Sequence, residues 1–267
     1  MLDAVGINHD PVSGSARIVS VVPSITELLF DLQLGESLVG RTGFCFHPKA
    51  EVKRLPKLGG TKDFDLDKLR ALQPTHLIVN VDENPKTLVD SAREFVPNIV
   101  VTHPMGPYDN VSLYQLMGHI FNRQTQAQQL TDDFLSSYRA ALTQTNHLDQ
   151  ERVLYIIWKK PWMTISRDTY IARILRSVGF NQIETNMNER YPEINIENYS
   201  GNVDRILLST EPFAFRNRDV DEIKAQVQIS GKPLISLIDG EMTSWYGSRA
   251  ILGYEYLASY RQKITTN

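Results

Sequence analysis

Residues 17–42 read RIVSVVPSITELLFDLQLGESLVGRT, and the pattern within this stretch decides the fold. The run from Arg17 to Val22 is short and mostly apolar, which is typical of a buried strand. Ser24 and Glu27 have the spacing of a capping box at the start of a helix. The helix that follows carries its apolar residues at helical spacing, at Ile25, Leu28, Leu29 and Leu32. Residues 37–40 predict a second strand, so the stretch forms a strand–helix–strand unit.

The same alternation continues toward residue 109. The sequence predicts helices over residues 65–72 and 85–95 and strands over residues 75–81 and 98–102. Strands that alternate with helices favour an α/β lobe with a mainly parallel sheet, which we place at residues 17–109. Residues 1–16 are polar and rich in turn formers, so we expect them to be unstructured or loosely attached.

A different pattern occupies the middle of the chain. From Val111 to about Asn146 there is no proline, and apolar residues recur three, four or seven positions apart. We expect one long linking helix over residues 110–147, which at about 1.5 Å per residue would span about 45 Å for some 30 residues. The alternative is two helices with a break near 122–125.

The α/β pattern then restarts over residues 148–267. Strands are predicted at 152–158, 203–209 and 233–238, and helices at 169–178, 220–227 and 248–260. The two halves also resemble each other, because DLDKL (65–69) and NIENY (195–199) each precede a strand. The expected fold is α/β, with two Rossmann-like lobes joined by the long helix and a ligand cleft between the lobes.

Composition excludes several classes of protein. The 267 residues carry a net charge of −3, with 42% hydrophobic and 22% charged residues, so nothing indicates a nucleic-acid-binding surface. The single cysteine, Cys45, excludes an internal disulfide. Residues 1–17 lack a basic segment followed by an apolar one, so either a leader has been removed or the chain stays in the cytoplasm.

The loops that follow the predicted strands are the candidate site, because ligands bind beyond the carboxyl ends of strands in open α/β sheets. These loops are rich in aromatic and basic residues, and they hold all three tryptophans, Trp158, Trp162 and Trp245. Aromatic rings give a ligand large rigid contacts, and arginine or lysine pairs with carboxylate or phosphate. The alternative is that several of these rings close hydrophobic loops.

No catalytic motif occurs in the sequence: it has no G-x-S-x-G, no P-loop, no H-E-x-x-H and no G-x-G-x-x-G. We therefore expect no catalytic residues and no enzyme. Cys45, His47 and His103 are weak metal candidates, since alternating residues in an extended segment face opposite ways and a closed site needs three or four ligands. Cys45 is more often a small buried hydrophobic residue.

Four segments together resemble one known family: 18–42, 58–79 (LGGTKDFDLDKLRALQPTHLIV), 153–164 (VLYIIWKKPWMT) and 239–249 (DGEMTSWYGSR). They are similar to the cobalamin-type and iron-siderophore-type periplasmic substrate-binding proteins of ABC transporters. The resemblance covers about residues 17–262 and implies two α/β lobes bridged by a long helix. The opening V-x-P-x-x-T-E motif is specific to that family but not to a ligand.

The resemblance implies a role for each candidate. Asp67, usually glutamate in the family, and Glu197 would dock to arginines of an ABC permease; the alternative is helix N-terminal charge. The ligand, a corrinoid, tetrapyrrole or iron chelate, would meet aromatic and charged groups at Phe44, Lys62, Trp162, Met163, Trp245, Tyr246 and Arg249. Tryptophans that the cobalamin-binding members carry near Thr61 and Val81 are absent here, so the surface is only partly cobalamin-like.

The resemblance also implies a monomer that works in the periplasm, with no nucleic-acid partner and no cofactor of its own, although the ligand would carry cobalt or iron. Three alternatives stay open at this point. They are a cytoplasmic binding or carrier module of the same fold, a binder of bare metal ions, and an enzyme acting on the bound ligand.

Overall fold

The computed structural model describes residues 1–186, 188–226 and 233–265. The chain divides into two compact units. The first comprises Met1–Pro104, Tyr108–Phe134 and Tyr246–Arg249; the second comprises Met105–Pro107, Leu135–Trp245 and Ala250–Asn267.

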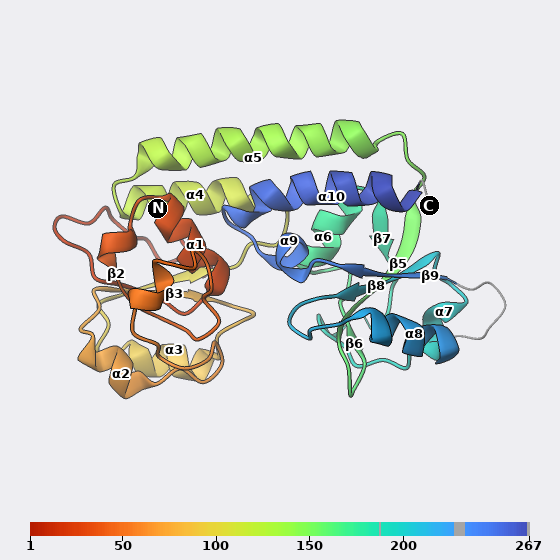
Figure 1. The fold of residues 1–267 in the computed structure, drawn as a ribbon. Helices are drawn as coiled ribbons and strands as arrows, with labels where there is room; N and C mark the ends of the chain where they lie inside the picture. The colour runs from red at the N-terminus through yellow and green to blue at the C-terminus, as the bar shows by residue number, and fades with distance from the viewer. Residues whose placement is uncertain (187, 227–232, 266–267) are drawn as a thin grey trace. The chain divides into compact units, whose positions relative to one another are not determined.

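A parallel sheet forms the centre of the first unit, in the order β2-β1-β3-β4 (Figure 1). Its strands are β1 (Ile18–Ser20), β2 (Leu38–Arg41), β3 (His76–Asn80) and β4 (Asn98–Thr102). The helices of this unit are α1 (Pro23–Asp31), α2 (Leu66–Ala71), α3 (Lys86–Ala92) and α4 (Asp109–Ile120), with short 3-10 turns η1 (Gly35–Ser37) and η2 (Val52–Arg54).

Side chains that alternate along these strands cover both faces of the sheet. Val19, Leu77 and Val101 pack in one core cluster with residues of α2 and α3, including Leu69 and Val89. The neighbouring residues on the same strands, Ile18, Ile78 and Val100, are also buried. A parallel strand buried on both faces reads as a continuous apolar run, which is why the sequence revealed these strands.

The second unit is built around a sheet of order β6-β5-β8-β9, with β7 also paired to β5. Its strands are β5 (Glu151–Trp158), β6 (Met163–Thr164), β7 (Phe180–Gln182), β8 (Arg205–Ser209) and β9 (Leu234–Ile238). All pairings are parallel except that of the short β6 with β5. The helices are α6 (Tyr170–Ser177), α7 (Glu197–Ser200), α8 (Asn217–Gln226), α9 (Gly240–Ser244) and α10 (Arg249–Thr265). The mainly parallel α/β architecture predicted for both halves is confirmed.

The prediction of one continuous helix from Val111 to Asn146 is wrong, because α4 ends at Ile120 and α5 runs from Gln124 to Thr145. Asn122 adopts φ 55°, and the Arg123 N–H donates to the Gly118 carbonyl at 2.7 Å. This is the bond of a Schellman C-cap, with asparagine in the left-handed position. A Cβ on Gly118 would lie 2.6 Å from the Cβ of Ala127, so glycine permits α5 to turn back closely over α4 (Figure 1). The long helix is α5, with 22 residues.

The N-terminal segment is also attached more firmly than its composition predicted. The Ala4 N–H donates to the Val101 carbonyl at 2.9 Å, and the Val101 N–H donates to the Asp3 carboxylate at 3.1 Å. The same carboxylate lies 3.1 Å from the buried His9 ring. The expectation of a loosely attached segment is therefore wrong for its first residues, because a buried Asp–His pair fixes them to strand β4.

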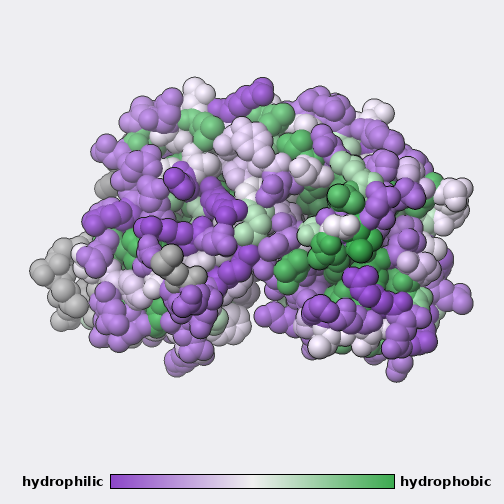
Figure 2. Space-filling model, turned by 180° about the vertical axis from the view of Figure 1, so that it is seen from behind, coloured by the Kyte–Doolittle hydropathy of each residue, from purple (hydrophilic) through white to green (hydrophobic). Residues whose placement is uncertain are grey.

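No helix among the described residues is long and apolar enough to cross a membrane. The face of the molecule in Figure 2 is largely hydrophilic, with hydrophobic side chains gathered in one patch toward its right side.

Candidate functional site

The carboxyl ends of β1 to β4 meet at one edge of the first sheet, because these strands are parallel. Large hydrophobic side chains on the following loops are unusually exposed: Phe44 is 54% exposed, Phe46 50% and Tyr108 62%. The sequence placed all three on candidate loops but included only Phe44 in the predicted ligand set. This edge presents aromatic surface to solvent.

Two buried asparagines organise the loops at this edge. The Asn84 side chain accepts the Asn80 N–H at 2.8 Å and donates to the Thr61 carbonyl at 2.8 Å. Asn84 also donates to the Val21 carbonyl at the end of β1, at 3.3 Å. One amide therefore connects three loops and positions the exposed Lys62, which follows Thr61 directly.

The carboxyl group of Glu83, the residue before Asn84, has an unusual environment. The Tyr246 hydroxyl donates to Glu83 Oε1 at 2.6 Å. Burial raises the pKa of Glu83 to about 7, and the nearby Lys62 ammonium opposes that rise. Burial and the Glu83 carboxyl raise the pKa of Tyr246 well above its usual value. The structure thus brings the predicted residues Lys62 and Tyr246 near the carboxyl group of Glu83, which is not in the predicted ligand set.

Arg249 lies in the interior and pairs with Glu27. Its Nε and NH2 donate to the two carboxylate oxygens at 2.8 and 2.5 Å, and the side chains are 8% and 16% exposed. The capping box predicted for Ser24 and Glu27 is wrong, because Val22 is the N-cap residue and makes no side-chain capping bond. Glu27 pairs with the distant arginine instead. A ligand role for Arg249 stays a prediction.

The weak metal candidates have the following surroundings. The Cys45 thiol is fully buried, 3.1 Å from Thr26 Oγ1, and burial raises its pKa. His103 lies 3.5 Å from the Asp82 carboxylate, while His47 is half-buried on the loop after β2. Among the described residues there is no group of three or more His, Cys, Asp or Glu side chains that could hold a metal ion.

The corresponding edge of the second sheet carries a row of aromatic rings. Trp158 contacts Phe213 edge-on with centroids 5.5 Å apart, and Phe213 lies 4.6 Å from Phe215. Phe215 in turn stacks on Trp162 at 6.1 Å with an interplanar angle of 6°. Trp158 is 39% exposed, so the row begins at the surface. Met163, beside Trp162, is half-buried in β6.

Trp245 is less accessible than its loop position predicted. It is 7% exposed, and its indole N–H donates to the Glu211 carboxylate at 3.0 Å. The hydrogen bond to Glu211 holds the Trp245 ring inside the second unit. Contact between Trp245 and a ligand stays a prediction.

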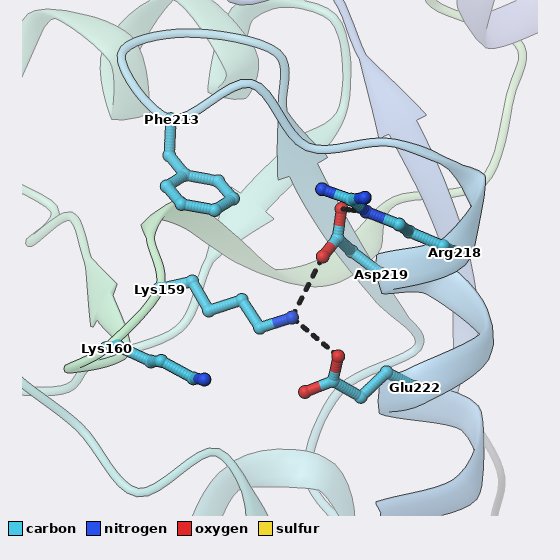
Figure 3. Close-up of a pocket in the computed structure, with 6 residues that line it drawn as sticks. All are labelled: Lys159, Lys160, Phe213, Arg218, Asp219 and Glu222. Atoms are coloured by element: carbon cyan, nitrogen blue, oxygen red, sulfur yellow. Dashed lines mark hydrogen bonds and ion pairs between the residues drawn. The ribbon is translucent and has the colours of Figure 1, made fainter.

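A cavity of about 370 Å³ adjoins the aromatic row (Figure 3). It is lined by Lys159, Lys160, Phe213, Arg218, Asp219 and Glu222. The Lys159 ammonium donates to Asp219 at 2.9 Å and to Glu222 at 2.5 Å. None of the cavity's three cations was in the predicted ligand set, although Lys159 and Lys160 lie on a loop that follows a predicted strand.

The two predicted docking residues occupy equivalent positions. The Asp65 carboxylate caps α2 by accepting the N–H groups of Asp67 and Lys68, each at 3.0 Å. The Asn195 side chain likewise accepts the Glu197 N–H at 3.0 Å, at the start of α7. Because Asp65 is the capping residue, the exposed Asp67 carboxylate is not needed to cap the helix.

Comparison with known proteins adds four findings. The vitamin B12-binding protein of Vibrio parahaemolyticus serotype O3:K6 (strain RIMD 2210633) is 22% identical over 189 residues, 71% of this chain and 67% of that protein. Among solved structures, the periplasmic vitamin B12 binding protein BtuF of Vibrio cholerae superposes with a TM-score of 0.80 at 17% identity, covering 95% of this chain and 99% of that one. A periplasmic heme binding protein from Pseudomonas aeruginosa gives a TM-score of 0.79 at 17% identity, covering 92% of both chains. A family model described as "Periplasmic binding protein" matches residues 18–231.

Proposed function

The chain belongs to the periplasmic binding protein family, and from this premise we propose that it is the substrate-binding component of an ABC-type importer. Its ligand is a corrinoid, a tetrapyrrole or an iron chelate, held by the aromatic loops at the carboxyl ends of the sheets. The protein binds this ligand and releases it unchanged. Any cobalt or iron arrives with the ligand, so the protein needs no resident cofactor.

The observation that carries this proposal is where the exposed aromatic surface lies. Phe44, Phe46 and Tyr108 in the first unit and Trp158 in the second are between 39% and 62% exposed. Phe44, Phe46 and Tyr108 follow strands of the parallel first sheet, and Trp158 is the last residue of β5 in the mainly parallel second sheet. These are the positions where α/β proteins bind ligands. Aromatic rings give a ligand large contact area, and a planar chelate would bury them.

The names of similar proteins support the ligand class. Relatives from Vibrio are named vitamin B12-binding proteins, and solved structures of the same fold are named as vitamin B12-binding or heme-binding. We propose that this chain likewise acts in the periplasm as a monomer, with Asp67 and Glu197 contacting basic residues of a permease. The exposure of Asp67 supports the docking role, since Asp65 already caps α2.

The test is binding of the purified protein to cobalamin, cobinamide, haemin and a few ferric siderophores, followed by quenching of tryptophan fluorescence. The proposal expects saturable quenching by one of these classes, reduced in Trp158→Ala. Saturable binding of bare metal ions with no quenching by any chelate would contradict it. Chemical conversion of a bound chelate would instead favour an enzyme.

A further inference from the structure

The cavity beside α8 contains more cationic than anionic side chains. Of its five charged lining residues, three are cations and two are carboxylates, which leaves a formal charge of +1. Lys159 is 12% exposed and is fixed between Asp219 and Glu222, so those two carboxylates are directed at it (Figure 3). The excess positive charge therefore resides on the other two cations.

Those two cations are Lys160 and Arg218. Within the ranges 1–186, 188–226 and 233–265, Lys160 forms no ion pair within 4.0 Å, and its side chain lines the cavity (Figure 3). Arg218 is 78% exposed and only just reaches Asp219, with Nε and Oδ2 4.0 Å apart. The Asp219 carboxylate is already occupied, because it also accepts the Arg216 N–H at 2.9 Å. Both cations are available to an anionic ligand group.

The wall of the same cavity is aromatic. Phe213 lines it and contacts both the exposed Trp158 and Phe215, which stacks on Trp162. Trp158 is 39% exposed, whereas Phe215 is 2% exposed and belongs to the core of the unit. A flat ligand would therefore contact Trp158 and Phe213 and bring its edge to the two cations. A combination of ring surface and nearby cations favours a planar molecule with anionic groups on its rim over a neutral one.

We propose that this cavity is a subsite for a carboxylate of the ligand, with Lys160 and Arg218 as the residues that pair with it. The ligand class is then a planar tetrapyrrole that carries carboxylate side chains. A corrinoid whose side chains are neutral amides lacks the charge that these cations recognise. This inference rests on the proposed function, and it selects one ligand class within it.

The test compares haemin with haemin dimethyl ester, which keeps the same ring and metal but has no free carboxylate. Binding is measured by quenching of tryptophan fluorescence in the unaltered protein and in the double variant Lys160→Gln/Arg218→Gln. The matched control is Lys224→Gln, a lysine of α8 that does not line the cavity. Circular dichroism checks that each variant is folded.

The unaltered protein should bind haemin at least tenfold more tightly than the ester, since a hydrogen bond to a charged group contributes about that factor. The double variant should lose roughly tenfold for haemin and little for the ester, and its haemin binding should depend less on salt. Equal affinity for haemin and ester, or a double variant that binds like the control, would overturn the subsite. Tight binding of cobalamin alone would also overturn it while leaving the proposed function intact, whereas no binding of any chelate would overturn both.

Discussion

The buried pair of Glu27 and Arg249 offers a test that separates a structural role for Arg249 from a role in ligand binding. Replacing Arg249 by leucine leaves the Glu27 carboxylate buried at 16% exposure without its two charged hydrogen bonds. Loss of one partner of a buried pair costs about 3–5 kcal/mol of unfolding free energy. Burial already raises the pKa of Glu27, and the Arg249 guanidinium opposes that rise, so the variant carboxyl should also take up a proton more readily.

The measurement is urea unfolding followed by circular dichroism. With a slope of about 3 kcal/mol per M, the expected loss lowers the midpoint by roughly 1–2 M. The matched control is Lys86→Ala, which removes an exposed pair with Asp90 (86% and 47% exposed) in the same unit and should cost about 0–1 kcal/mol.

The double variant Glu27→Leu/Arg249→Leu completes the experiment, because replacing both members of a buried pair with apolar residues is often neutral. We expect it to regain most of the stability, and its ligand binding then tests the second role. If Arg249→Leu behaves like the Lys86 control, the pair does not stabilise the unit. If the double variant is stable but no longer binds ligand, Arg249 contacts the ligand as well as pairing with Glu27; normal binding would refute the ligand role.

Three further predictions follow from the described contacts. Alanine at both Asp67 and Glu197 should abolish uptake in cells while leaving ligand affinity of the purified protein unchanged; unimpaired uptake would refute the docking role. Gly118→Ala should destabilise the protein by about 1–3 kcal/mol in thermal unfolding, because the new Cβ would lie 2.6 Å from a side-chain carbon of α5. This is the opposite of the effect of alanine in an ordinary helix. The control Gly14→Ala, with nothing within 4 Å, should be close to neutral. Glu83 has a folded-state pKa of about 7, above its usual 4.5, so its proton stabilises the fold at low pH and this stabilisation is lost as pH rises through 7. Relative to Glu83→Gln, the unaltered protein should therefore lose up to about 3 kcal/mol between pH 5 and 8, and parallel pH profiles would contradict this.

The sequence predicted those elements whose signal is local. Strand β4 has the predicted bounds, 98–102, because a buried parallel strand is a continuous apolar run. Strand β7 was missed, since it has three residues and two of them are polar. Gln182 is nevertheless buried there because its side chain accepts the Tyr155 N–H at 2.9 Å, a contact that only the folded sheet creates.

The sequence predicted one helix where the structure has two, α4 and α5. Apolar periodicity extends across residues 111–146, but one asparagine in a left-handed conformation is enough to end a helix. Asparagine is a residue type that ends helices in this way, so Asn122 was a local signal for the break. The longer run of apolar periodicity outweighed that signal in the prediction.

For the site, loop positions could be predicted but partners could not. The sequence placed aromatic and charged residues beyond the strands, and Phe44 and Trp162 lie there as expected. It could not show that Arg249 pairs with a residue 222 positions away, or that Trp245 donates to Glu211. Such pairings depend on tertiary packing, which no local pattern encodes.

The most direct test of the central claim is hydrogen exchange of the protein with and without a saturating chelate, read by mass spectrometry. The account predicts slower exchange in the loops beyond the strands, at residues 42–47, 59–62, 81–84, 158–163 and 211–216. Exchange in α2, which carries the docking residue, should not change. Protection confined to regions away from these loops would show that the ligand binds elsewhere and would contradict the account.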